Sequence, residues 1–269
     1  TRTGKKYSPG VPKNYRKVVN HLEKFEKDTR FKVTFENIDL HFYQKYVSYL
    51  NKQGMATNSV GDSIKNLKVL MRQAMKDGMH TNSAYLDQDF VKPSEEVENI
   101  YLTESEITTI YNLDLSQRPG LDRVRDVFVV GCSTGLRFSD LHQLQPENIF
   151  SDGRFIQIRT QKTNKTVIIP LNPKVRAIFE KYSGSLPRVL TNQRMNDHVK
   201  EIAQIAGLTE KVSQTQTKGG KRITKTLEKW QLVTTHTARR SFATNAYLAG
   251  IPTIDIMRLT GHKTETSFM

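Results

Sequence analysis

The chain has 269 residues, of which 36% are hydrophobic and 25% are charged, proportions that suit a folded globular protein of one or two domains. It holds no run of about 18 apolar residues, which argues against a membrane-spanning helix. Lys and Arg (41) outnumber Asp and Glu (27), so the formal net charge is +14. Residues 1–95 and 96–269 each carry +7, which favours contact of both parts with a polyanion such as nucleic acid.

The start of the chain and its single cysteine bear on cellular location. The first residues, Thr1–Lys6, lack the apolar segment of a signal peptide, and the missing initiator methionine suggests an internal start. Cys132 has no second cysteine with which to form an internal disulfide. These features fit a reducing cytoplasm.

Residues 9–95 have the spacing of a small helical bundle. Apolar residues recur at helical intervals from Tyr15 to Phe25, with Pro12 placed to start that helix. Two further helices are expected, and a short fourth helix is possible around residues 83–90. The boundaries of the second and third helices are indicated by capping and stop residues: Asp39, Gly54, Thr57 or Asn58, and Gly78.

The third of these helices has a basic face beside its apolar stripe. A charged outer face is usually only solvated, but on a basic chain it can also follow the phosphates of a DNA backbone. The residues on this face are Lys65, Lys68, Arg72 and Lys76.

Residues 91–101 read as a linker, because they contain Pro93 and a cluster of glutamates. A second domain is expected over residues 100–269. Its elements include a helix opened by the capping-box pattern Thr103–Glu106 and a buried helix that ends at Gly135. The other expected elements are a β-hairpin over 154–170 with Lys162 at its turn, helices over 172–182 and 193–206, and a last short helix from Pro252.

The segment 211–229 is distinct in composition, with six basic residues, one acidic residue and the pair Gly219-Gly220 at the expected tip of a hairpin. Two interpretations stay open, a basic finger that lies over DNA and a disordered loop. The candidate DNA contacts in this segment are Lys218, Lys221 and Arg222.

The stretch from His236 to Thr244 opens a helix that Gly250 is expected to close. His236 and Arg239 are three residues apart, so both side chains lie on one face near the amino end of the helix. Free N–H groups, the helix dipole, a guanidinium and an imidazole together suit a phosphate. Alone, this motif is weak, and a solvated arginine with a capping histidine is the favoured interpretation.

Three further motifs, which occur with this one in a fixed order along the chain, favour the phosphate-binding interpretation. Thr134–Arg137 with Asp140, Lys162 in a β-turn, His236 with Arg239, and Gly261-His262 together resemble the tyrosine recombinases, also called phage-type integrases. The similarity covers most of the chain. It implies a mainly α fold with a small antiparallel β-sheet, in which residues 1–95 are a helical, SAM-like core-binding domain and residues 100–269 a mixed α/β catalytic domain. The subfamily most resembled is that of mobile elements in Bacteroides-type bacteria.

The resemblance also implies a role for each site residue. Arg137 and Arg239 match the paired arginines that hold the non-bridging phosphate oxygens, and Lys162 matches the lysine that protonates the leaving 5′-oxygen. His236 matches the histidine that assists proton removal from the nucleophile, and His262 matches the group that hydrogen-bonds the scissile phosphate. Asp140 would orient Arg137, or serve only as a helix-cap acid.

The chain departs from the family in one important respect. The nucleophilic tyrosine should follow His262 on a helix, and counting places it beyond Met269, so the chain as given is expected to bind DNA without cutting it. Arg240 stands where many relatives have histidine, and the family's arm-binding domain is absent. The expected function is site-specific recombination through a 3′-phosphotyrosine, on duplex DNA, as a homotetramer, in a bacterial cytoplasm.

Two other functions stay open. One is a catalytically inactive DNA-binding protein of the same fold, and the other is a metal-dependent nuclease. No metal or other cofactor is implied, because the remaining histidines show no ligand spacing with cysteine or carboxylates and the two arginines can supply the positive charge that a metal would bring.

Overall fold

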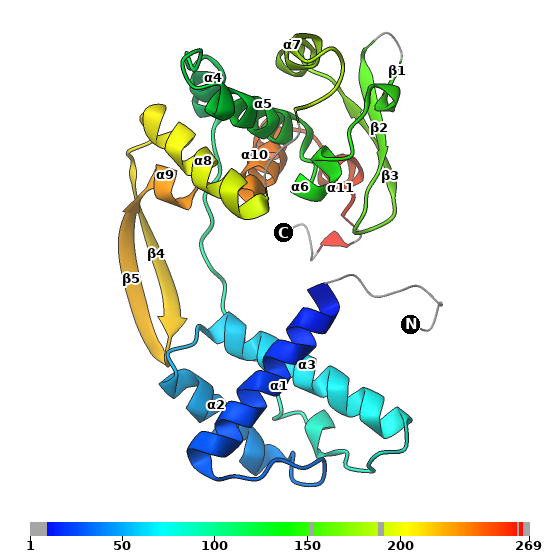
Figure 1. Ribbon diagram of the computed structural model, residues 1–269, viewed down its shortest axis with the longest axis vertical. Helices are drawn as coiled ribbons and strands as arrows, with labels where there is room; N and C mark the ends of the chain where they lie inside the picture. Colours follow the sequence, from blue (N-terminus) through cyan, green and yellow to red (C-terminus); the bar gives the residue numbers. More distant parts are fainter. Residues whose placement is uncertain (1–9, 151–152, 188–190, 263, 266–269) are drawn as a thin grey trace. The chain divides into compact units, whose positions relative to one another are not determined.

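The computed structural model describes residues 10–150, 153–187, 191–262 and 264–265, which form two units. The first unit holds the residues up to Glu98 together with Ser213–Lys225, and the second holds Asn99–Val212 and the residues from Thr226 onward. The described chain is mainly helical with small antiparallel sheets (Figure 1), which confirms the predicted fold class.

The described part of the first unit is built on the α-helices α1 (Gly10–Thr29), α2 (Leu40–Lys52) and α3 (Thr57–Lys76). The core between them is rich in aromatic rings. The ring of Phe25 lies 5.7 Å from that of Phe42, 5.4 Å from that of Tyr46 and 5.3 Å from that of Tyr49. All four side chains are buried, so the apolar stripes of α1 and α2 form one packed aromatic cluster.

Capping chemistry sets the ends of α2 and α3. The Asp39 carboxylate accepts a hydrogen bond from the Phe42 amide at 2.8 Å, and Gly78 follows α3 with a φ of 72°. The expected fourth helix is wrong in length, because residues Ala84–Leu86 form only a 3₁₀ turn. The Asp87 side chain accepts from the Asp89 amide at 2.8 Å, a local bond that competes with helix propagation.

The segment described above as a finger or a loop is a β-hairpin. Strands β4 (Lys211–Lys218) and β5 (Lys221–Glu228) pair with each other, and Gly219 and Gly220 turn between them with φ values of 61° and 71°. Its tip packs on the α2–α3 connection, where the Gly219 amide donates to the Met55 carbonyl at 2.9 Å. The hairpin tip is therefore an ordered part of the first unit, and the disordered-loop interpretation is wrong.

The linker fixes the hairpin in place through Glu95. The Thr217 amide donates to both carboxylate oxygens of Glu95 at 3.0 and 2.9 Å. Asn58 holds the Glu95 backbone with two further hydrogen bonds of 3.0 and 3.1 Å. A Cβ on Gly61 would lie 1.9 Å from the Pro93 carbonyl oxygen, so only glycine lets the linker pack this closely on α3.

We expect Glu95→Ala to raise the hydrogen-exchange rate of the Thr217 amide about 10- to 100-fold, because a hydrogen bond to a charged group contributes about 1.5–3 kcal/mol. Exchange measured residue by residue by NMR tests this. Glu96→Ala, which truncates the neighbouring exposed glutamate, is the matched control and should leave the Thr217 amide protected. An unchanged rate in Glu95→Ala would mean that the other contacts hold the hairpin without this carboxylate.

The second unit surrounds the buried helix α5 (Pro119–Thr134), whose residues from Val124 to Cys132 are all buried. Helix α10 (Thr235–Leu248) lies beside it (Figure 1), and a Cβ on Gly131 of α5 would sit 3.3 Å from the Ala238 methyl group. The helices around this pair are α4 (Glu104–Tyr111), α6 (Phe138–Leu141), α7 (Pro173–Lys181), α8 (Asn192–Ile205), α9 (Lys229–Leu232) and α11 (Thr253–Thr260).

A three-stranded antiparallel sheet of order β1-β2-β3 completes the second unit: β1 (Ile149–Phe150), β2 (Phe155–Arg159) and β3 (Thr166–Pro170). The register places Phe155 opposite Pro170 and Arg159 opposite Thr166. Ile156, Ile158, Val167 and Ile169 point into the core, so one face of the hairpin is anchored while its turn projects from the sheet. The predicted hairpin over 154–170 is confirmed.

Candidate active site

Helix α10 positions two of the site residues. Thr234 caps it in a capping box with Thr237, so the helix starts at a defined residue. His236 therefore lies in the first turn and Arg239 in the next, against α5. The Arg239 side chain has little choice of conformation, because the residue is only 4% exposed.

The Arg239 guanidinium is held by backbone carbonyl groups from two other elements. Its Nη1 donates to the Gly135 carbonyl at 2.7 Å and its Nη2 donates to the Thr260 carbonyl at 2.7 Å. Gly135 ends α5 in the left-handed conformation, and a Cβ there would lie 2.5 Å from the Phe242 ring. Burial and the nearby Arg137 charge lower the pKa of Arg239 to about 10, so it stays protonated at neutral pH.

His262 lies against Arg239. Nη2 of Arg239 is 2.9 Å from Nε2 of His262, and the Thr260 hydroxyl is 2.7 Å from Nδ1. Since a guanidinium can only donate, Nε2 accepts, which assigns the proton of the neutral ring to Nδ1. Burial, followed by the charge of Arg239, lowers the pKa of His262 to about 4, in agreement with that neutral form.

Arg137 is the N-cap residue of α6 and lies two residues after Gly135, so the end of α5 brings it near Arg239. Its Nη1 is buried and has no hydrogen-bond partner among the described residues. Asp140 is fully buried and accepts from the Gln161 amide at 2.8 Å. This contact ties α6 to the β2–β3 turn. The Asp140 amide donates to the Arg137 carbonyl at 2.8 Å, but within the described residues no hydrogen bond joins the Asp140 carboxylate to the Arg137 guanidinium.

Lys162 is exposed at the β2–β3 turn, where Asn164 adopts a φ of 55°. Its charge acts on both His236 and His262. A second lysine of the same turn, Lys165, donates to the His262 carbonyl at 3.4 Å. The sequence reasoning missed Lys165, although a turn with two lysines was a signal that either could reach the site.

Positively charged side chains surround both His236 and His262. Burial is the main cause of the lowered pKa of His236, and neighbouring cations add to it. The cations that act on His236 are Arg240, Arg239, Arg137 and Lys162. Apart from the buried Asp140, the contacts of the described site residues involve no carboxylate, so the arrangement suits an anion.

The expected titration of His262 has a clear sign. An unfolded histidine titrates near 6.5, so between about pH 4 and 6.5 the unfolded chain binds more protons than the native one. Acidification through that range should therefore destabilise the second unit. NMR titration of the imidazole, assigned with His262→Gln, should give a midpoint near 4, and added inorganic phosphate should raise it. A midpoint near 6.5 without phosphate would contradict the neutral ring deduced above.

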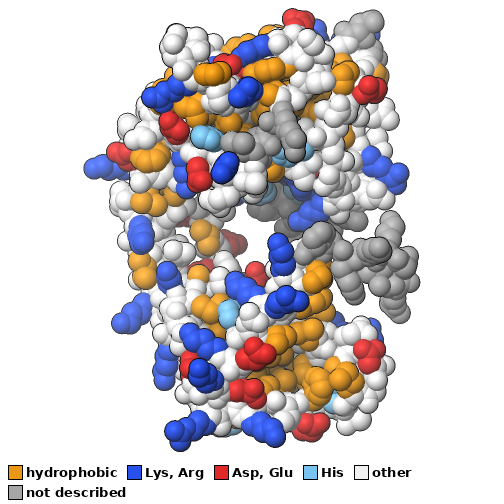
Figure 2. Space-filling view, viewed as in Figure 1, with side chains coloured by type: hydrophobic (Ala, Val, Ile, Leu, Met, Phe, Trp, Pro, Cys, Tyr) orange, Lys and Arg blue, Asp and Glu red, His pale blue; other side chains and the backbone are white. Residues whose placement is uncertain are grey.

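The candidate DNA contacts outside this site are mostly exposed. Lys65, Arg72 and Lys76 face solvent along α3, and Lys218, Lys221 and Arg222 are exposed at the hairpin. Figure 2 shows Lys and Arg side chains spread over both units. Lys68 differs, because its amine donates to the Phe90 carbonyl at 2.8 Å and lies over the Phe90 ring. Lys68 therefore has a structural role within the first unit.

Within the described ranges, no cluster of three or more histidine, cysteine or acidic side chains could hold a metal ion. The helices of those same ranges are all too short or too polar to cross a membrane. The pKa of the buried Cys132 thiol is raised by burial, so this thiol is not activated as a nucleophile.

Comparison with known proteins agrees with this fold. Residues 101–269 match the model of the phage integrase family, and residues 1–91 match that of the phage integrase SAM-like domain. The chain therefore belongs to the phage integrase family, which confirms the resemblance drawn from the four motifs.

Among curated relatives, the chain is 24% identical over 255 residues to tyrosine recombinase XerD of Listeria monocytogenes serotype 4b (strain F2365), covering 91% of this chain and 84% of the relative. It is 24% identical over 231 residues to tyrosine recombinase XerD of Staphylococcus aureus (strain N315), covering 84% and 75%.

Among solved structures, a lambda integrase dimer bound to a COC′ core site has a TM-score of 0.69 at 16% identity, covering 97% of this chain and 91% of that chain. XerH recombinase bound to palindromic difH substrate has a TM-score of 0.70 at 14% identity, covering 95% and 74%. These likenesses establish the shared fold.

Proposed function

We propose that this chain is a site-specific DNA recombinase that cuts and rejoins duplex DNA through a 3′-phosphotyrosine intermediate. The observation that carries the proposal is the buried Arg239, oriented by two carbonyl groups and in contact with His262. Close by lies a buried nitrogen of Arg137 that has no hydrogen-bond partner among the residues that the structure describes. Guanidinium N–H donors that are held in place before the substrate binds can stabilise the negative charge that develops on the phosphate oxygens in the transition state.

Each group then has a role. Arg137 and Arg239 bind the two non-bridging oxygens, and neutral His236 accepts the proton of the attacking tyrosine hydroxyl. Lys162 protonates the 5′-oxygen that leaves. His262 exchanges its contact with Arg239 for one with the phosphate, to which it donates once the phosphate has raised its pKa and Nε2 is protonated. The covalent phosphotyrosine conserves the energy of the broken bond, so rejoining the strands needs no ATP. We expect the tyrosine to follow His262 on a helix beyond Met269.

The proposed substrate is duplex DNA, bound through its phosphates by the exposed basic residues of both units. We propose a homotetramer on DNA and action in the bacterial cytoplasm. Solved relatives include a lambda integrase tetramer bound to a Holliday junction, which supports such an assembly. A mobile element of a Bacteroides-type bacterium as its source stays a prediction.

The direct test is covalent capture on a nicked duplex that carries the target site, with a chain that includes the expected tyrosine. A protein–DNA adduct on a denaturing gel, formed equally with EDTA present, is the expected result. Binding without an adduct would favour the alternative, an inactive DNA-binding protein of the same fold. Cleavage that disappears with EDTA would favour a metal-dependent nuclease.

A further inference from the structure

A short extended segment, here called the strap, lies along α10, the helix that carries His236 and Arg239. It runs from Ile100 to Thr103, just after the second unit begins at Asn99, and leads into α4. Leu102 at its centre is fully buried. Because the strap lies outside any helix or strand, its buried peptide groups need hydrogen-bond partners from elsewhere.

Two side chains of α10 supply those partners. The Leu102 amide donates to the Ser241 hydroxyl at 2.8 Å, and the Asn245 side-chain amide donates to the Leu102 carbonyl at 3.0 Å. Ser241 and Asn245 are four residues apart and so share one helix face. The Ser241 hydroxyl is itself fixed, because it is fully buried and donates to the Thr237 carbonyl at 2.8 Å.

A third residue, Arg240, holds the start of the strap, since its Nη1 donates to the Ile100 carbonyl at 3.1 Å. Arg240 follows Arg239 directly and lies four residues after His236. Arg239, which is proposed to bind the phosphate, is thus followed directly by Arg240 and Ser241, which are hydrogen-bonded to the strap. A shift of α10 relative to the strap would move both site residues, because they belong to the same rigid helix.

We propose that Arg240, Ser241 and Asn245 are positioning residues. They fix α10 against Ile100 and Leu102 of the strap and so determine the positions of Arg239 and His236. This inference rests on the proposed function, since it concerns the same phosphate site. None of the three residues needs to touch the phosphate. They act through the hydrogen bonds to the strap, which determine how far along its own axis α10 can slide.

The test is the affinity of the chain for inorganic vanadate, a mimic of a phosphate in transfer, measured by calorimetry. Asn245→Asp sets a carboxylate against the Leu102 carbonyl, and Ser241→Ala with Asn245→Ala removes both partners. Each variant should bind vanadate about tenfold more weakly, since small misplacements of binding groups are costly. Thr244→Ala, on the same helix, is the control and should bind like the unaltered chain. Circular dichroism confirms that each variant is folded, and Asn245→Asp leaves the buried Ser241 intact.

A double-mutant cycle with Arg239→Lys distinguishes positioning of Arg239 by the strap from a general structural role of the strap contacts. If the strap acts through Arg239, Asn245→Asp should change vanadate affinity less than twofold in the Arg239→Lys background. A full tenfold loss there, or no loss in otherwise unaltered chain, would overturn the inference. No vanadate binding by the unaltered chain would overturn it together with the proposed function. Vanadate binding that depends on the strap, without any covalent DNA adduct, would overturn only the proposed function.

Discussion

In a chain that includes the expected tyrosine, Arg239→Lys should slow strand cleavage about 100- to 1,000-fold, the usual cost of removing one preorganised transition-state donor. The lysine keeps the charge, but its single ammonium group cannot replace the planar guanidinium, whose several N–H groups donate to the Gly135 carbonyl, the Thr260 carbonyl and a phosphate oxygen at the same time. DNA affinity should change only slightly, because one contact among many phosphate contacts is altered. Single-turnover adduct formation and a separate DNA-binding titration measure the two quantities.

Arg258→Lys is the matched control. Arg258 lies on α11, its side chain is 75% exposed, and it pairs with Asp255 at 3.0 Å, so this change should leave the cleavage rate as it was. Cleavage by Arg239→Lys at the unaltered rate would show that its guanidinium does not hold the scissile phosphate.

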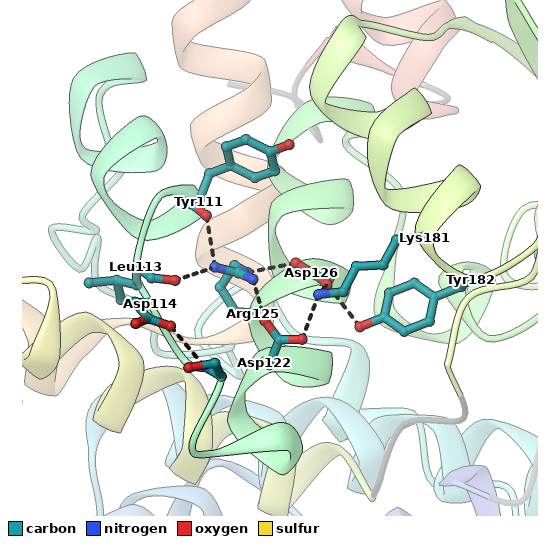
Figure 3. A network of polar contacts seen from close by, with 9 residues as sticks. Tyr111, Leu113, Asp114, Asp122, Arg125, Asp126, Lys181 and Tyr182 are labelled. Atoms are coloured by element: carbon teal, nitrogen blue, oxygen red, sulfur yellow. Dashed lines mark hydrogen bonds and ion pairs between the residues drawn. The ribbon is translucent and has the colours of Figure 1, made fainter.

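Asp126→Ala is expected to destabilise the second unit by about 3–5 kcal/mol, the range for breaking a buried ion pair. Figure 3 shows why: Asp126 lies between Arg125, Lys181 and Tyr182. It accepts from them at 2.6, 2.7 and 2.8 Å, and its side chain is only 2% exposed. Truncation leaves the buried Arg125 charge short of a partner, although Asp122 still contacts it.

Urea unfolding followed by fluorescence measures this loss, because the single tryptophan of the chain, Trp230, belongs to the second unit. Asp255→Ala is the control. It breaks an exposed ion pair on α11 and should cost less than about 1 kcal/mol. Equal effects of the two substitutions would mean that the buried network contributes no more than a surface pair.

The network around Asp126 was not apparent from the sequence. Asp122, Arg125 and Asp126 are near neighbours on a helix and resemble an ordinary charged face. Only the packing of α7 against α5 brings Lys181 and Tyr182 to them and excludes water. The hairpin tip is a similar case, because its contacts with Met55 and Glu95 join residues more than 100 positions apart.

By itself, the sequence determined what depends on neighbouring residues: the helices with their caps, the β2–β3 hairpin, and the four motifs that placed the chain in its family. These features rest on periodicity and on side-chain-to-backbone bonds within a few residues. The tertiary structure alone decided which partner each polar group has. Arg239 donates to the Gly135 and Thr260 carbonyls, and Asp140 accepts from the Gln161 amide. The strap is hydrogen-bonded to Ser241 and Asn245. Such pairings depend on how distant segments pack, and no local pattern encodes that packing.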